Sequence, residues 1–375
     1  MDNKQAMAAQ EKTIRDDVLT VSAPGRLCLF GEHQDYFDLP VLAVAIDLRI
    51  RITGRRRPGE KKLCLDLPDI GEKIDIPLGH VLSYIRKRDY LRSAVNVLAR
   101  RQICCDSGWE CRIKGDIPIN SGTASSSALQ VAWVVFLLAA AGSHPADDPA
   151  AAAELAFESE VAEFDEPGGK MDHYTSALGG VVSIHFGPPL KAGSLPHSLR
   201  EFVLADSMVR KDTTGTLGFI KSHVLNAAEK LKKVRPEFNL KESPVKTVEN
   251  TIADLSPVEK RLLTGTLMTR DITEEGERLF RGGDMDHHHF GRLLNRQQQV
   301  IRDHLKISSH RIDHMISTAR AAGALGAKIN GSGEGGCIFA YCPARAEKVA
   351  KELEKLNCRV FIVHVSEGVK IHSRT

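Results

Sequence analysis

A loop rich in glycine and serine, followed by a long apolar stretch, is the feature that most constrains how this chain folds. Residues 115–128 read Gly-Asp-Ile-Pro-Ile-Asn-Ser-Gly-Thr-Ala-Ser-Ser-Ser-Ala, a strand pattern precedes them, and apolar residues continue to Leu138. Glycine lets the backbone approach a ligand closely, and serine hydroxyls can donate hydrogen bonds. The N–H groups at a helix start attract anions. The order strand, loop, helix therefore favours a triphosphate site at residues 118–128.

This loop alone leaves two interpretations open. The phosphate-binding patterns GxxxxGK[ST] and GxGxxG are both absent from it. A serine that caps the helix, beside a loop glycine, would account for the same residues without any ligand. The decision depends on other segments of the chain.

A second polar segment lies near the N-terminus. Residues 23–36 read APGRLCLFGEHQDY and place Arg26, Glu32, His33 and Asp35 within ten residues of a largely apolar stretch. Carboxylates accept hydrogen bonds and histidine can donate or accept, so this cluster could hold several hydroxyl groups. A plain surface turn is the alternative.

A third segment, residues 327–337, reads AKINGSGEGGC between two strand patterns. Its four glycines are more than a simple hairpin turn needs. We expect a turn here that passes close to another part of the molecule.

Bulk composition excludes several classes of function. The chain has 375 residues and a net charge of +3, from 51 Lys and Arg against 48 Asp and Glu. So small a charge predicts no nucleic-acid partner and no membrane surface. The first 17 residues are polar and resemble neither a signal peptide nor an anchor. The longest apolar run is about a dozen residues, fewer than the roughly 20 that span a bilayer.

The cysteines and histidines do not indicate a metal site. None of the eight cysteines forms a CxxC pair, so we expect reduced thiols in a cytoplasmic protein. Residues 287–289 are three histidines. Consecutive side chains on a helix point about 100° apart, so these three cannot converge on one ion.

The residue patterns predict an α+β fold in two lobes. We expect a flexible segment at residues 1–17, an N-terminal lobe at 18–195 and a C-terminal lobe at 196–375, linked through residues 187–196. The basic residues 55–57 precede Pro58-Gly59 and predict a hairpin tip. Expected strands are residues 18–30 (interrupted by a turn at Pro24-Gly25), 46–53, 109–113, 179–186, 202–206, 327–329, 337–341 and 359–363; expected helices are 90–101, 125–138, 149–164, 217–234, 257–269, 286–305, 310–322 and 344–356.

Taken together, the three segments resemble the motifs of the kinases grouped as galactokinase, homoserine kinase, mevalonate kinase and phosphomevalonate kinase (GHMP kinases). APGRLCLFGEHQDY is similar to the first motif, PINSGTASSSA to the second and KINGSGEGGCIFA to the third, in the same order along residues 18–365. The resemblance implies a ribosomal-protein-S5-like N-terminal lobe, a ferredoxin-like C-terminal lobe and an active site between the lobes. It also implies ATP and Mg²⁺ as cofactors.

Within that family the galactokinases are most similar, because they carry PGRxNLxGEHxDY. Residues 167–173, PGGKMDH, are similar to the segment around the galactokinase catalytic Asp. The resemblance implies that Asp172 is the base or orienting carboxylate and that Arg26 stabilises charge on the transferring group. The other implied residues are Glu32, His33, Asp35 and Gly169 for the sugar; Pro118, Asn120, Ser121, Gly122, Ala124, Ser125, Ser126 and Ser127 for ATP; and Ser126 and Glu160 for Mg²⁺.

Departures from the galactokinase pattern lie near the sugar. Galactokinases usually have Asn-Gly-Gly where this chain has residues 37–39, Phe-Asp-Leu, and Gly-Ile-Met-Asp-Gln where it has residues 169–173, Gly-Lys-Met-Asp-His. Lys170 is thus a new charge that would meet an acidic or altered sugar, or point to solvent. We expect a kinase, monomeric or homodimeric, for the anomeric 1-OH of galactose or a related monosaccharide. Residues 39–47 read like the mevalonate branch, so a mevalonate-type alcohol kinase is one alternative, and a non-catalytic sugar and ATP sensor is the other.

Overall fold

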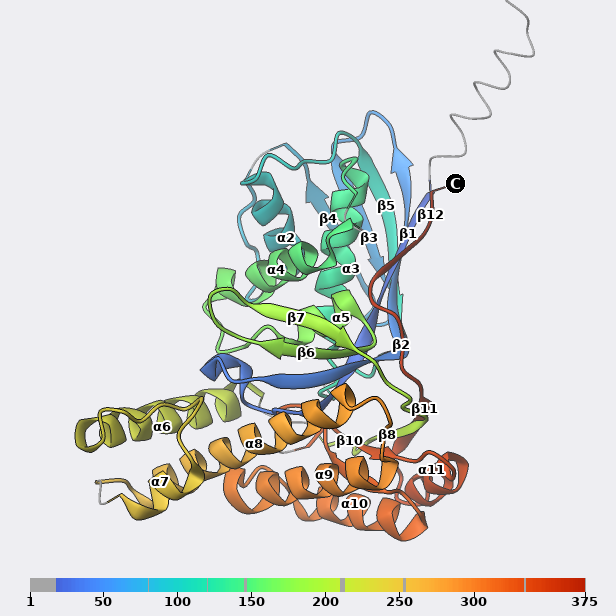
Figure 1. The fold of residues 1–375 in the computed structure, drawn as a ribbon. Coiled ribbons are helices and arrows are strands. Elements are labelled where there is room, and N and C mark those ends of the chain that lie inside the picture. The colour runs from blue at the N-terminus through green and yellow to red at the C-terminus, as the bar shows by residue number, and fades with distance from the viewer. Residues whose placement is uncertain are drawn as a thin grey trace, which may run out of the picture.

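The computed structural model describes residues 18–79, 81–119, 121–144, 147–209, 213–251, 254–333 and 335–374. Its elements form two lobes, one above the other in Figure 1. The upper lobe contains an eight-stranded sheet and the lower lobe a four-stranded sheet. The predicted α+β fold in two lobes is confirmed. The expected flexible segment, residues 1–17, lies outside the described residues.

The sheet of the upper lobe has the strand order β12-β1-β2-β5-β3-β4, with β6 on β2 and β7 on β6. Its strands are β1 (Val18–Phe30), β2 (Val41–Arg57), β3 (Lys62–Leu67), β4 (Glu72–Pro77), β5 (Gly108–Gly115), β6 (Val181–His185), β7 (Lys191–Leu195) and β12 (Lys370–Arg374). The helices of this lobe are α2 (Tyr90–Ala99), α3 (Ser125–Ala140), α4 (Pro149–Glu160) and α5 (Met171–Leu178), with short 3₁₀ turns η1 (Asp35–Phe37) and η3 (Ala162–Phe164).

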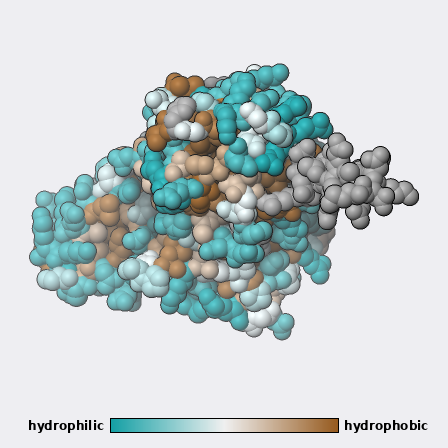
Figure 2. Space-filling model, turned by 90° about the horizontal axis from the view of Figure 1, so that it is seen from above, coloured by the Kyte–Doolittle hydropathy of each residue, from teal (hydrophilic) through white to brown (hydrophobic). Residues whose placement is uncertain are grey.

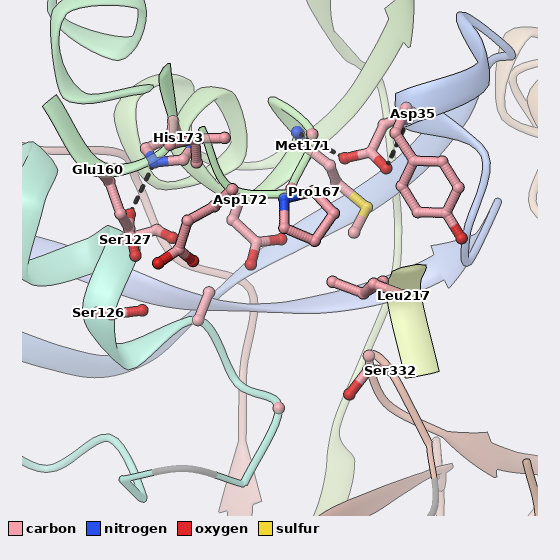
Figure 3. Close-up of a pocket in the computed structure, with 18 of the residues that line it drawn as sticks. Asp35, Ser126, Ser127, Glu160, Pro167, Met171, Asp172, His173, Leu217 and Ser332 are labelled. Carbon is pink, nitrogen blue, oxygen red and sulfur yellow. Dashed lines mark hydrogen bonds and ion pairs between the residues drawn. The ribbon is translucent and has the colours of Figure 1, made fainter. Parts of the chain in front are cut away.

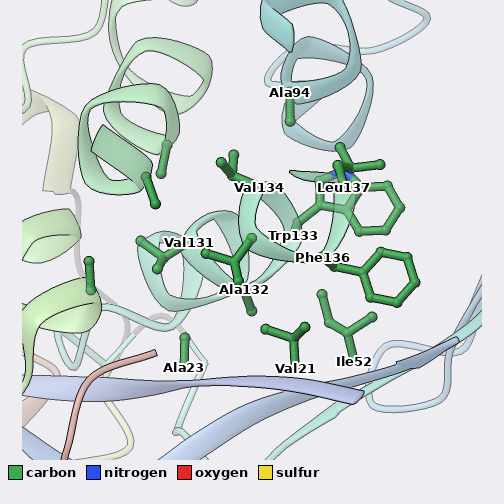
Figure 4. Packing of buried hydrophobic residues seen from close by; sticks show 14 of the residues in the cluster. Val21, Ala23, Ile52, Ala94, Val131, Ala132, Trp133, Val134, Phe136 and Leu137 are labelled. Carbon is green, nitrogen blue, oxygen red and sulfur yellow. The ribbon is translucent and has the colours of Figure 1, made fainter. Parts of the chain in front are cut away.

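Helix α3 is the centre of the upper core. Its body is apolar on all sides, as expected for a helix with sheet on one side and other helices on the other. Trp133 and Phe136 are buried on it, and Val21 of β1 and Ile52 of β2 lie beneath it (Figure 4). Burial of each large side chain contributes about 1.5–3 kcal/mol. The glycine- and serine-rich segment of residues 115–128, called the serine loop below, leads into the start of α3. This end of the segment is therefore fixed to the sheet.

The sheet of the lower lobe has the order β11-β8-β10-β9 and is antiparallel throughout. Numbered along the chain this is 4-1-3-2, the order expected of a ferredoxin-like lobe. Its strands are β8 (Phe202–Asp206), β9 (Gly326–Ile329), β10 (Cys337–Tyr341) and β11 (Arg359–Val363). The helices are α6 (Thr213–Val234), α7 (Val245–Asn250), α8 (Pro257–Arg281), α9 (His287–Val300), α10 (His310–Ala322) and α11 (Ala346–Glu354), with a π-helical turn, η4 (Ile301–Leu305), after α9.

Both faces of the lower sheet are buried, and they join two different cores. On β8, Val203 and Ala205 face the core formed with α10 and α11, whereas Phe202 and Leu204 belong to a core shared with β1. In this shared core Phe290 of α9 meets Phe30 of β1 edge to face, with ring centroids 5.8 Å apart. The two lobes are therefore held together by continuous apolar packing.

Several predicted elements need correction. Residues 55–57 end β2, but β2 and β3 are not hairpin partners, because β5 lies between them. The expected turn at Pro24-Gly25 is only a shift in the register of a continuous β1. Residues 191–195 form β7 on the upper sheet, so the link between the lobes begins after Leu195. Helix α4 stops at Glu160, and α8 continues to Arg281, well past the expected end.

The last strand crosses back to the upper lobe. β12 pairs with β1, so residues 370–374 complete the upper sheet although they follow the lower lobe in sequence (Figure 1). Apart from β12, the elements before residue 196 lie in the upper lobe and those after it in the lower lobe. The exact residue limits of the two lobes stay a prediction.

The surface carries no membrane-spanning helix among the residues that the structure describes. Figure 2 shows hydrophilic residues around the margins of one face and hydrophobic residues toward its middle. The three histidines of residues 287–289 diverge as expected: His287 contacts the Tyr341 hydroxyl and His289 pairs with Glu275.

Candidate active site

A cavity of about 260 Å³ is lined by most of the residues that the sequence motifs imply. Four segments meet around it: the serine loop, the N-terminal polar segment (residues 23–36), the start of α5, and the glycine-rich segment after β9 within residues 327–337, called the glycine loop below. The implied residues that line it are Arg26, Glu32, His33, Asp35, Gly122, Ala124, Ser125, Ser126, Ser127, Glu160, Gly169 and Asp172. Pro118 and Ser121 are buried beside the cavity and do not line it. Asn120 lies outside the described residues.

The serine loop reaches α3 without a side-chain cap. The N-cap residue is Ala124, in the left-handed region at φ 60°, and the helix has no side-chain cap hydrogen bond at this residue. The alternative of a serine cap is therefore wrong. The Ser121 and Thr123 hydroxyls instead donate to the carbonyl of Pro118, at 2.7 and 3.2 Å, and fold the loop. The N–H groups at the start of α3 are left for an anion in the cavity.

Arg26 and Asp172 form a bidentate ion pair. Arg26 Nε lies 2.7 Å from one carboxylate oxygen of Asp172 and Nη2 lies 3.0 Å from the other. The Arg26 side chain is 5% exposed and that of Asp172 26%, so the carboxylate reaches the cavity while its partner is buried. Arg26 Nη1 also donates to the carbonyl of Gly122. One guanidinium thus connects the serine loop to Asp172.

Asp172 occupies the middle of the cavity. Figure 3 shows it between Ser126, Ser127 and Glu160 on one side and Asp35 and Met171 on the other. A phosphoryl donor held by the serines and an acceptor held by Asp35 would therefore meet at Asp172.

Glu160 has a partner that the sequence motifs did not indicate. His173 Nε2 lies 2.7 Å from Glu160 Oε2, and both side chains are buried. Ser126 and Glu160 fit Mg²⁺ by the chemistry of their oxygen ligands. No cluster of three or more His, Cys, Asp or Glu side chains suited to a metal occurs among the described residues. A cation at Ser126 and Glu160 would therefore rely on phosphate oxygens for the rest of its coordination.

The carboxylate of Asp35 is held by the backbone. Oδ1 accepts from the N–H of Tyr36 at 3.1 Å and Oδ2 accepts from the N–H of Met171 at 3.3 Å. Burial, and then the nearby Asp172 carboxylate, raise the pKa of Asp35 to about 6. This carboxylate gains most from a ligand that donates hydrogen bonds.

Glu32 is more deeply buried than a surface turn allows. It is 1% exposed, and one of its carboxylate oxygens is paired with the ammonium of Lys328, which is fully buried. The other oxygen, Oε2, has no hydrogen-bond partner among the residues that the structure describes. A buried unpaired carboxylate oxygen costs free energy, so a hydroxyl donor in the cavity would relieve that cost.

His33 is already engaged on both ring nitrogens. Nε2 lies 3.3 Å from the carbonyl of Ser332, so it donates there, and Nδ1 accepts from the Tyr36 hydroxyl at 2.7 Å. A hydrogen bond from His33 to a sugar would require one of these contacts to be exchanged. The side chain connects the N-terminal segment to the glycine loop of the lower lobe.

Lys170 does not face the cavity. Its ammonium lies 2.8 Å from both carboxylate oxygens of Glu154 and 5.0 Å from the centre of the Phe157 ring. This ion pair links the start of α5 to α4, and neither interpretation drawn from the sequence included it.

The glycine loop passes close to the serine loop, as predicted. Gly331, Gly333, Gly335 and Gly336 all have positive φ angles. A β-carbon on Gly331 would lie 3.0 Å from the carbonyl of Gly122. The glycines therefore provide both the backbone conformation and the space for this approach.

Other residues of the cavity were missed from the sequence. Arg88, Tyr90 and Glu166 line one end, where Arg88 and Glu166 form an ion pair. Met171 and Leu217 contribute an apolar wall close to Asp35 (Figure 3). Met171 lies in the motif segment of residues 167–173, whereas the others belong to no recognisable motif and are brought together only by the fold.

Comparisons with known proteins agree with this geometry. Family profiles match residues 279–358 (GHMP kinases C terminal), 89–180 (GHMP kinases N terminal domain) and 10–56 (galactokinase galactose-binding signature). The mevalonate kinase of Pyrococcus furiosus is 26% identical over 360 residues, covering 93% of this chain and 97% of that protein. The galactokinase of Mannheimia succiniciproducens is 26% identical over 361 residues, covering 91% of this chain and 90% of that protein.

A solved structure is similar over almost the whole length. Lactococcus lactis galactokinase complexed with galactose has a TM-score of 0.82 at 22% identity, covering 97% of this chain and 99% of that one. Fold, cavity and profiles together define a small-molecule kinase. The chain belongs to the GHMP kinase family, and its N-terminal segment has the galactokinase type of signature.

Alanine in place of Gly169 should raise the KM for the phosphoryl acceptor by about 10-fold to 10²-fold, because small displacements of a binding group are costly. A β-carbon there would overlap the Asp35 carboxylate. The KM for ATP should change by less than about twofold, since Gly169 lies on the acceptor side. Initial rates with each substrate varied separately would check this.

Gly168→Ala is the matched control, because its β-carbon would meet only Val161, at 3.4 and 3.5 Å. Equal effects of the two substitutions on the KM for the phosphoryl acceptor would refute a specific contact between residue 169 and Asp35.

Proposed function

We propose that this chain transfers the γ-phosphoryl group of ATP to the anomeric 1-OH of galactose or a related monosaccharide. The observation that supports this most is the position of Asp172, paired with Arg26, between the serines at the start of α3 and the carboxylate of Asp35 (Figure 3). The galactose-binding signature at residues 10–56 supports a sugar as the acceptor.

In this mechanism the acceptor hydroxyl attacks the γ-phosphorus while the bond from that phosphorus to the β–γ bridging oxygen breaks, and ADP leaves. Asp172 orients the hydroxyl and takes its proton. Arg26, at 2.7 Å from Asp172, offsets the negative charge that gathers on the transferring group. The N–H groups at the start of α3 hold the phosphates. Mg²⁺ at Ser126 and Glu160 would neutralise phosphate charge when bound.

The acceptor side favours a compound with several hydroxyl groups. Oε2 of Glu32 has no donor among the described residues, and each Asp35 oxygen accepts one backbone N–H and can accept a further hydrogen bond. A monosaccharide supplies neighbouring hydroxyls to satisfy both at once. A site of this kind rejects analogues that lack the hydroxyl, because its buried acceptor is then left unpaired.

A mevalonate-type alcohol kinase is the second candidate. Mevalonate kinases are among the relatives with the same identity as the galactokinases, and Met171 and Leu217 give the cavity an apolar wall. A panel of galactose, other monosaccharides and mevalonate, followed by ADP release, separates the candidates. Phosphorylation of mevalonate and of no monosaccharide would overturn the sugar proposal, and ³¹P NMR of the product would identify the phosphorylated hydroxyl.

The same panel tests a non-catalytic sensor. A sensor binds sugar and ATP without releasing ADP above background. Because Arg26, Asp172, Ser126 and Glu160 all line the cavity, we expect turnover.

The KM for the sugar should rise severalfold as pH falls through about 6, the pKa of Asp35. Its charged carboxylate can accept from two hydroxyls, and protonation removes part of this capacity. The pKa is raised, so the charged form is present above about 6 and lost below it. A pH profile of kcat/KM for the sugar checks this. In Asp35→Asn the fall in kcat/KM below about pH 6 should be absent. A fall that persists in this variant would assign the titration to another group.

A further inference from the structure

Asn330 is a buried side chain for which the mechanism gives no role. It follows β9 at the start of the glycine loop and is 0% exposed. Its Oδ1 accepts from the N–H of Cys28 at 2.9 Å. Its Nδ2 donates to the carbonyl of Gly122 at 2.9 Å and to the carbonyl of Arg26 at 3.3 Å. Both ends of the amide are therefore used.

These partners come from two separate segments of the chain, and two of them, Arg26 and Gly122, line the cavity. Arg26 and Cys28 lie on β1, which carries the guanidinium that holds Asp172, and Gly122 lies in the serine loop. The carbonyl of Gly122 receives a second donor, Nη1 of Arg26. Two side-chain donors thus fix this carbonyl, and with it the distance from the loop to the Asp172–Arg26 pair.

The backbone after Asn330 strengthens the same connection. The N–H of Asn330 donates to the carbonyl of Cys337 at 3.0 Å, and the N–H of Cys337 donates to the carbonyl of Ser121 at 2.8 Å. The serine loop is therefore attached to the lower lobe at two successive residues, Ser121 and Gly122. The attachment through Gly122 is made by the side chain of Asn330, so a substitution at residue 330 can remove it.

We propose that Asn330 is a positioning residue that holds the serine loop in the conformation that binds the phosphates of ATP. This inference rests on the proposed function in one respect, namely that the loop binds ATP. Asn330 touches no reacting atom and acts through Gly122. Its removal should disturb phosphate binding beyond any effect on stability, because a loosened loop must be ordered again when ATP binds.

Asn330→Ala should weaken the binding of MgATP about tenfold, the effect expected from losing hydrogen bonds that order a binding loop. Asn295→Ala is a matched control. The Asn295 amide also bridges two backbone groups, with Nδ2 3.0 Å from the Leu325 carbonyl and Oδ1 3.2 Å from the Ala327 N–H, and it does not line the cavity. Calorimetric titration with MgATP and thermal unfolding of both variants separate binding from stability.

Hydrogen exchange without nucleotide gives a second readout. Amides of residues 121–127 should exchange faster in Asn330→Ala than in wild type, and at the wild-type rate in Asn295→Ala. If Asn330→Ala does not fold, Asn330→Ser serves in both measurements. MgATP affinity within about twofold of wild type, or equal losses in the two variants, would overturn the inference. A wild-type chain that binds no ATP would instead refute the proposed function, while the exchange rates still test the positioning.

Discussion

Replacing Asp172 by Asn should lower turnover by ~10²–10³ while ATP affinity stays within about twofold. The amide has the shape of the carboxylate but cannot take the proton of the acceptor hydroxyl. It also removes the negative partner of Arg26, whose Nε and Nη2 lie 2.7 and 3.0 Å from the carboxylate. In Figure 3 Asp172 lies between the serines at the start of α3 and Asp35, and it is not part of the serine loop. We therefore expect ATP binding to be spared.

ADP release at saturating substrates and calorimetric titration with ATP measure the two quantities. Glu154→Gln is the control, because Glu154 also forms an ion pair at this end of α5, with Lys170, yet does not line the cavity. It should retain most of the turnover. A variant Asp172→Asn with more than about a tenth of wild-type turnover would place the proton acceptor elsewhere.

The same substitution has a consequence for Asp35. The Asp172 carboxylate contributes to the raised pKa of Asp35. Removing that charge moves the pKa of Asp35 toward its ordinary, lower value. In Asp172→Asn, the loss of sugar affinity on acidification should therefore occur at lower pH than in wild type.

Elements with a clear apolar pattern could be predicted from the sequence, and elements fixed by distant partners or lacking an end signal could not. β8 was predicted with its observed limits, and α3 within two residues. Helix α5, which carries Asp172, was missed because it has only 8 residues and no side-chain cap at Lys170. β12 was missed because pairing with β1, at the other end of the chain, determines it. Local propensity carries no information about such partners.

The sequence predicted which segments form the site. It did not predict which side-chain atoms in those segments already form hydrogen bonds within the protein. The motifs brought Arg26 and Asp172 together correctly. They could not show that the Ser121 hydroxyl folds its own loop, or that both ring nitrogens of His33 have protein partners. Lys328 stands 296 positions from Glu32, and no local pattern indicates that the two pair. Side-chain hydrogen bonds between distant segments are a property of the folded chain.

That buried pair gives the second large effect. Lys328→Met should lower the free energy of unfolding by roughly 3–5 kcal/mol, the usual consequence of removing one partner of a buried ion pair. The Lys328 ammonium contacts Glu32 and also donates to the carbonyls of Cys28 and Ile329, at 3.0 and 2.8 Å. Without it, Glu32 is either charged with no partner or protonated, and both states cost free energy.

Urea unfolding of the single and double variants isolates the interaction. Glu32→Gln with Lys328→Met should be more stable than Lys328→Met alone, because an amide is cheaper to bury than an unpaired carboxylate. Lys62→Met is the control: Lys62 also pairs with a carboxylate, that of Asp75, but both are exposed, so the unfolding midpoint should not move measurably.

If Lys328→Met is as stable as wild type, the pair contributes nothing to the fold. Glu32 would then not be held by Lys328, and its unpaired oxygen could not serve as a fixed acceptor for a sugar hydroxyl. If the double variant regains stability but binds the sugar about tenfold or more weakly, the pair is retained for recognition and not for folding. The ratio of these two effects therefore decides whether Glu32 is principally a structural residue or a sugar ligand.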